Sequence, residues 1–138
     1  MTKLLVAVDE STHADDVCAV AAKWAVTMTA DVVLLHARVE QMQPRGLPDA
    51  TETGASADEL LVRLADAMRA AGVTNVEPRV DTALAGDEVQ VILDTAADVG
   101  ADGIVIGHRG TSRLTQLLIG SVAHKLIQLA DRPVLVVR

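Results

Sequence analysis

Short apolar runs and amphipathic segments alternate along this chain. The apolar runs are long enough for buried strands, and the segments between them carry apolar residues at helical spacing. Strands are expected at 4–8, 32–37, 76–83, 102–106 and 133–137. Helices are expected at about 12–28, 56–71, 87–99 and 122–130. This alternation predicts an α/β fold, an open and mostly parallel five-stranded sheet with helices on both faces.

Local signals support several of these boundaries. Thr12 and Ser56 each begin a sequence with the spacing of a capping box, and Asp87 is placed to cap the third helix. Gly72 is a natural residue to follow the second helix. Pro78 removes a backbone donor from the third strand, which indicates an edge position in the sheet.

One long stretch shows no periodicity. It runs from Glu40 to Ala55 and contains prolines and glycines. Loops of this length are uncommon in compact domains and often act as lids or binding loops. We expect a surface loop here, and whether it closes over a ligand stays open.

Composition narrows the classes of function. The 138 residues fit one domain, 1–138, and Trp24, expected in the core, is the only aromatic residue. The lack of aromatic residues and the net charge of −7 argue against nucleic-acid binding. The lone Cys18, expected to be a core thiol, cannot form an internal disulfide and fits a reducing compartment. No apolar run approaches the roughly 20 residues of a membrane span. We therefore expect a cytoplasmic protein with neither a nucleic acid nor a membrane as partner.

A glycine-rich segment follows the fourth strand. Gly107, Gly110 and Gly120 let the backbone approach phosphate oxygens closely and take positive φ where the loop requires it. The helix after Ser121 offers unpaired N–H groups and a partial positive charge to an anion. Ser121 can either cap that helix or donate its hydroxyl to a phosphate. The segment is therefore predicted to be a phosphate cradle.

Positive charge accompanies this cradle. Arg109 and Arg113 flank the glycines, whereas the acidic excess of the chain lies upstream. Because the charges coincide with the glycine spacing, we expect Arg109 to meet an anionic ligand. The alternative is a solvated loop with ordinary surface arginines.

The strand ends point to the same place. In open α/β sheets, ligands bind beyond the carboxyl ends of strands where the strand order reverses. The first strand ends at Asp9, the second at Ala37 and the fourth at Gly107. We expect these ends to form one crevice with the cradle. His36, beside apolar neighbours, is expected to be a satisfied structural histidine, not a catalyst.

Essentially the whole chain resembles the universal stress protein family. The most specific match is Gly107-x2-Gly110-x9-Gly120-Ser121, which is the family's ATP-binding motif. Asp9 at the end of the first strand agrees as well, as does Leu34-Leu35-His36. The resemblance implies a Rossmann-like sheet of order 3-2-1-4-5. It also implies a homodimer in which the last strands, 133–137, pair across a twofold axis.

The same resemblance implies roles for individual residues. Asp9 would face the ribose and base of ATP, and Ala37 would contact adenine through its backbone. Mg²⁺ or Mn²⁺ is expected with the triphosphate, although no residue is assigned to a metal and none to catalysis. The phosphates would be held by Gly107, Gly110, Gly120 and Ser121.

These observations favour an ATP-binding regulatory protein whose nucleotide state is read by a partner. A slow ATPase is one alternative, although no Walker-type P-loop and no general base stand out. A dimeric interaction module that binds no nucleotide is the other. The sequence leaves open the signal, the protein partner, and the choice between ATP and ADP.

Overall fold

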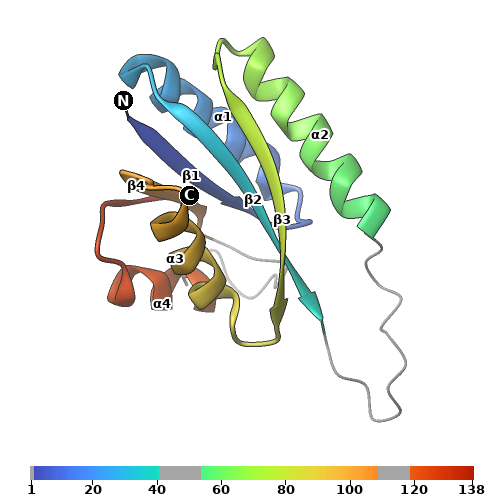
Figure 1. Ribbon diagram of the computed structural model, residues 1–138, viewed down its shortest axis with the longest axis vertical. Helices are drawn as coiled ribbons and strands as arrows, with labels where there is room; N and C mark the ends of the chain where they lie inside the picture. Colours follow the sequence, from blue (N-terminus) through green and yellow to red (C-terminus); the bar gives the residue numbers. More distant parts are fainter. Residues whose placement is uncertain (1, 41–53, 109–118) are drawn as a thin grey trace.

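The structure is a computed structural model that describes residues 2–40, 54–108 and 119–138. Its strands form one parallel sheet of order β3-β2-β1-β4-β5 (Figure 1). This confirms the predicted α/β fold and the Rossmann-like strand order implied by the resemblance. The elements are β1 (Lys3–Val8), α1 (His13–Met28), β2 (Asp31–Glu40), α2 (Gly54–Ala70), β3 (Val76–Leu84), α3 (Glu88–Asp98), β4 (Gly103–Gly107), α4 (Ser121–Leu129) and β5 (Val134–Val137).

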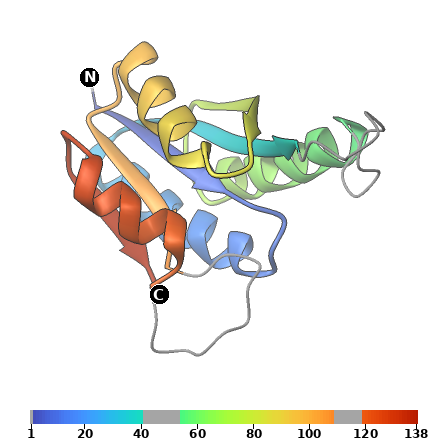
Figure 2. The same cartoon turned by 90° about the horizontal axis from the view of Figure 1, so that it is seen from below.

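Helices cover both faces of the sheet (Figure 2). Each face has its own hydrophobic core. On one face, α1 and α2 pack over strand residues such as Val6 and Val105. On the other face, α3 and α4 pack over alternate residues such as Leu5 and Ile104. The central strands are therefore buried on both sides, which explains their nearly continuous apolar sequence.

The strands differ in how far they extend. Pairing of β1 with β2 ends at Val8 and His36, whereas β2 and β3 stay paired as far as Glu40 and Leu84. A two-stranded extension thus projects beyond the carboxyl end of β1 (Figure 1). β3 lies at the sheet edge, as Pro78 predicted. The expected loop 40–55 is wrong at its margins because Glu40 ends β2 and α2 begins at Gly54. Residues 41–53 lie outside the described part of the chain.

The predicted caps differ from the structure. Thr12 occupies the N-cap of α1 but has helical φ and ψ of −62° and −18°, and its side chain makes no capping hydrogen bond. A capping side chain needs an extended backbone at that residue, which explains the failure. The helix α2 begins at Gly54, so Ser56 lies inside it and not at its cap. Asp87 is the N-cap residue of α3, again without a capping bond from its side chain.

The expected burial of Trp24 is wrong as well. Its side chain is 48% exposed, whereas α1 turns a face of mostly small residues toward the sheet. Because these small residues let the helix approach the strands closely, the indole has no room on that face. Ile127 of α4 is likewise 47% exposed.

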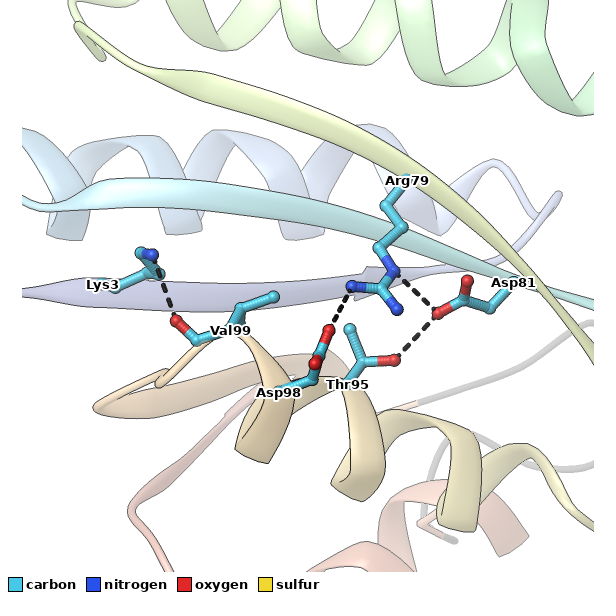
Figure 3. Close-up of polar contacts among 6 residues, drawn as sticks. All are labelled: Lys3, Arg79, Asp81, Thr95, Asp98 and Val99. Carbon is cyan, nitrogen blue, oxygen red and sulfur yellow. Dashed lines mark hydrogen bonds and ion pairs between the residues drawn. The ribbon is translucent and has the colours of Figure 1, made fainter.

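A polar network fixes α3 against the neighbouring edge of the sheet. The guanidinium of Arg79 on β3 donates to Asp98 at 2.9 Å and to Asp81 at 3.0 Å (Figure 3). The buried hydroxyl of Thr95 donates to the same Asp81 oxygen at 2.9 Å. Hydrogen bonds to Asp98 and then Asp81 raise the pKa of Arg79. The guanidinium therefore remains a cation and bridges strand and helix.

Side chains from distant segments also donate hydrogen bonds to backbone carbonyls at the carboxyl end of α3. Lys3 Nζ donates to the carbonyl of Val99 at 3.1 Å (Figure 3). Arg132 Nη1 donates to the carbonyls of Ala96 and Ala101 at 2.9 and 2.8 Å. The last turn of α3 is therefore capped by cations from β1 and from the segment before β5, as its dipole favours.

Candidate functional site

The candidate site lies where β1 and β4 end side by side. These strands are neighbours in the sheet, and their pairing ends at Ala7 and Ile106. Asp9 follows β1 directly, and Gly107 is the last residue of β4. From these ends the chain leads to α1 on one face of the sheet and to α4 on the other. This is the reversal of strand order at which ligands bind in open α/β sheets.

A backbone hydrogen bond brings Gly120 back to this edge. Its N–H donates to the carbonyl of His108 at 2.7 Å. Gly107 and Gly120, thirteen positions apart in the sequence, therefore both adjoin His108, one along the chain and the other through this hydrogen bond. The predicted Arg109 and Gly110 lie in the segment 109–118, outside the described residues.

The amino terminus of α4 opens at the same place. The helix begins at Ser121 and Gly120 is its N-cap residue, so of the two roles left open for Ser121 the N-cap is not adopted, and the phosphate contact stays a prediction. Within the described residues, no side chain caps this helix. Its first N–H groups and the exposed Ser121 hydroxyl can therefore serve an anion.

The backbone conformation at Gly107 and Gly120 does not require glycine. Gly120 has φ −58° and ψ 153°, which any residue can adopt. Among the described glycines, positive φ occurs only at Gly72, Gly86 and Gly100. Gly107 and Gly120 therefore do not use the positive φ that glycine would allow there. A glycine that the backbone does not require is consistent with a group that must come close to it.

Asp9 is held in place by the turn that follows β1. Its Oδ1 accepts hydrogen bonds from the backbone N–H of Ser11, at 2.9 Å, and from the Ser11 hydroxyl. No donor from the described residues reaches the second oxygen, Oδ2, and the side chain is partly exposed. Asp9 is thus oriented by one oxygen and can accept ligand hydroxyls with the other.

Ala37 and His36 lie on the other side of β1. Ala37 is the first residue of β2 beyond its pairing with β1, and it is partly exposed. His36 is buried, with Nδ1 3.0 Å from the carbonyl oxygen of Val8. His36 therefore ties the ends of β1 and β2 together, which confirms its prediction as a satisfied structural histidine.

Sequence reasoning missed a connection between this site and β5. The carbonyl of Val137 accepts from the backbone N–H of His108 at 2.7 Å and from His13 Nε2 at 3.1 Å. Since a carbonyl only accepts, Nε2 of His13 carries the proton. The contact joins residues 124 positions apart, so no local pattern announces it.

The described residues contain neither a metal-binding cluster nor a membrane-spanning helix. Across the described ranges, no three His, Cys, Asp or Glu side chains are arranged to hold a metal ion. No described helix is both long and apolar enough to span a membrane.

Known proteins of similar sequence and structure cover this chain to different extents. A universal stress protein from Thermus aquaticus is 34% identical over 98% of this chain and 97% of its own length. The universal stress protein YxiE of Bacillus subtilis is 45% identical, but the match spans only 38% of this chain and 36% of that protein.

A solved structure adds a ligand to the comparison. The universal stress protein from Archaeoglobus fulgidus, in complex with dAMP, superimposes with a TM-score of 0.73 at 27% identity, covering 100% of this chain and 98% of that one. The sequence model of the universal stress protein family matches residues 1–138. The chain therefore belongs to the universal stress protein family.

Proposed function

We propose that residues 1–138 are a single domain that binds ATP at the carboxyl ends of β1 and β4 and acts as a nucleotide-dependent regulatory switch in the cytoplasm. One observation carries the proposal: Gly107 and Gly120 flank the uncapped amino terminus of α4 without a conformational need for glycine. A phosphate group at this position would make use of both the open N–H groups and the missing Cβ atoms. The dAMP complex of the related protein from Archaeoglobus fulgidus supports an adenine nucleotide as the ligand.

Each part of the nucleotide has a matching part of the proposed site. The oriented carboxylate of Asp9 suits ribose hydroxyls, since it offers acceptors and would repel bare phosphate. Ala37, beyond the end of β1, would meet adenine through its backbone. The phosphates would be bound by Gly107, Arg109, Gly110, Gly120 and Ser121.

A divalent cation would accompany the triphosphate. Mg²⁺ is commonly bound through substrate phosphates and water with few protein ligands. In this arrangement Mg²⁺ or Mn²⁺ would offset phosphate charge. We assign no residue of this chain to the metal.

The proposed switch is a homodimer formed through residues 133–137. β5 lies at one edge of the sheet, and its residues Val134, Leu135 and Val136 are only partly buried. An apolar edge strand with unpaired backbone groups favours pairing with a second strand. Because Val137 also bonds the backbone of His108, this edge is physically connected to the proposed phosphate site.

The first test is to identify any nucleotide that denaturation releases from the purified protein. Mass analysis of the released ligand would be followed by calorimetric titration of the stripped protein with ATP, with and without Mg²⁺. We expect co-purified adenine nucleotide or micromolar binding. A folded sample that carries no nucleotide and does not bind ATP would overturn the proposal.

A further inference from the structure

One side of α1 forms a stripe that follows the edge of the sheet. His13, Val20 and Trp24 stand at positions i, i+7 and i+11, so they share one side of the helix. His13 contacts the carbonyl of Val137, which shows that this side faces β5. The opposite side of the helix faces α2, where Asp15 pairs with Arg63 at 2.6 Å.

The stripe is apolar and incompletely covered. Val20 and Leu135 of β5 are partly buried and pack against the same core. Trp24 is 48% exposed, and Met28, one turn further along, is 37% exposed. The patch thus combines Trp24 and Val20 of α1 with Leu135 of the edge strand β5. An exposed apolar patch at a sheet edge is typical of a protein interface.

Pairing of β5 with a second copy would bring two such stripes together. Antiparallel pairing of identical edge strands places the twofold axis perpendicular to the sheet. The α1 helices of both copies then lie on the same side of the joined sheet, one on each side of the β5 pair. Leu135 of each copy lies between them, and Trp24 borders the resulting groove.

We propose that Trp24, with Val20 and Leu135, packs against a second copy of this chain and supplies apolar area that β5 alone lacks. The inference rests on the proposed β5 dimer. Stable interfaces bury about 1,200–2,000 Å² in total, whereas β5 has four residues. A tryptophan buries about 150–250 Å², so one from each copy would be a substantial addition. Trp24 would thus contribute to the dimer interface and not to the hydrophobic core.

Because Trp24 is the only aromatic residue, its fluorescence reports on this surface without labelling. We expect its emission to move to shorter wavelength, and acrylamide quenching to fall, as the wild-type concentration rises through the dimer dissociation constant. Sedimentation velocity would measure the same transition independently. We expect Trp24→Asp to weaken dimerisation at least tenfold, about 1.4 kcal/mol.

The matched control is Val62→Asp, which places the same charge on a 55% exposed apolar residue of α2. It should leave the dimer unchanged. Circular dichroism would confirm folding of each variant, and Trp24→Ala replaces Trp24→Asp if the charged variant does not fold. The inference would be overturned if wild type and Trp24 variants dimerise equally and the wild-type emission does not change with protein concentration. That result would leave the β5 dimer in place.

Other outcomes separate the two proposals further. A wild-type protein that stays monomeric at all concentrations would overturn both the β5 dimer and the role of Trp24, whereas nucleotide binding is decided separately by calorimetry. A blue shift of Trp24 that appears only with a different protein, while the wild type remains monomeric, would also overturn this inference.

Discussion

The backbone N–H of Gly120 donates to the carbonyl of His108 at 2.7 Å, and this bond joins the residue before α4 to the residue after β4. The N–H of the same His108 donates to Val137, the last residue of β5, also at 2.7 Å. One residue thus joins the end of β4, the start of α4 and the edge strand. These two bonds connect the proposed phosphate site to the edge strand through described residues.

Replacing Gly120 by valine should abolish ATP binding while the fold survives. The φ of −58° and ψ of 153° allow a side chain, but the added atoms would occupy the space that we assign to phosphate. We expect ATP affinity in calorimetry to fall by more than about tenfold, or 1.4 kcal/mol. Gly107→Val should act in the same way.

A folding check and a second variant serve as controls for this test. Circular dichroism and thermal unfolding would establish that the glycine variants are folded. Ser121→Ala removes only a hydroxyl and should weaken binding less than Gly120→Val. Unchanged ATP affinity in folded Gly107 and Gly120 variants would contradict the phosphate site.

Asp9→Ala should weaken nucleoside recognition more than phosphate recognition. A hydrogen bond to a charged group contributes about 1.5–3 kcal/mol, so ATP affinity should fall about 10- to 150-fold. Tripolyphosphate, which has no ribose, should bind the variant almost as well as the wild type. Competition between the two ligands in calorimetry would measure the difference.

The control for charge is Asp16→Ala, which removes a carboxylate 75% exposed in the first turn of α1. Ser11→Ala removes one hydrogen bond to Asp9 and should have an intermediate effect. Equal losses for ATP and tripolyphosphate in Asp9→Ala would argue against a ribose contact.

Arg132→Met should destabilise the fold more than Arg63→Met. Arg132 is only 17% exposed and satisfies two carbonyls at the end of α3, so its loss should cost about 1–3 kcal/mol. Arg63 and Asp15 are more than half exposed, and such a surface pair contributes about 0–1 kcal/mol. Urea unfolding of both variants would compare the free energies. Equal losses would show that the surface pair matters as much as the cap.

Cys18 should react slowly with thiol reagents in the native protein. Burial, with a smaller contribution from the nearby Asp15 carboxylate, raises the pKa of the Cys18 thiol to about 12. The thiolate is the reactive form, so it is scarce near neutral pH. We expect modification by an aromatic disulfide at pH 8 to be far slower in buffer than in denaturing urea. Comparable rates would show that the thiol is accessible.

The same pKa shift predicts a dependence of stability on pH. An unfolded chain with a thiol pKa near 9 loses its proton first, so the folded state binds more protons between about 9 and 12. Stability from this group is therefore complete below pH 9 and falls above it, by at most about 1.4 kcal/mol per pH unit. Unfolding free energies at pH 8 and 10 should differ less in Cys18→Ala than in wild type. An identical pH dependence would contradict the shift.

Local sequence determined which segments become strands and helices. Strands such as 4–8 are buried on both faces, so their apolar runs are unbroken, and the helices between them repeat apolar residues at their own period. The resemblance added the strand order and the family's site motif. From these, the meeting of Asp9 and Gly107 at one edge of the sheet could be predicted, since parallel neighbours end together.

Tertiary structure alone decided how the helices sit and which distant groups meet. Trp24 is exposed because small residues bring α1 close to the sheet. The spacing of apolar residues along the helix does not predict how closely it packs. Thr12 and Ser121 fail to cap because the backbone entering each helix sets the cap residue. The contacts of Val137 with His13 and His108 and of Arg132 with the end of α3 join segments far apart in the chain. Periodicity reports a residue's own element, whereas these partners are set by how the elements pack.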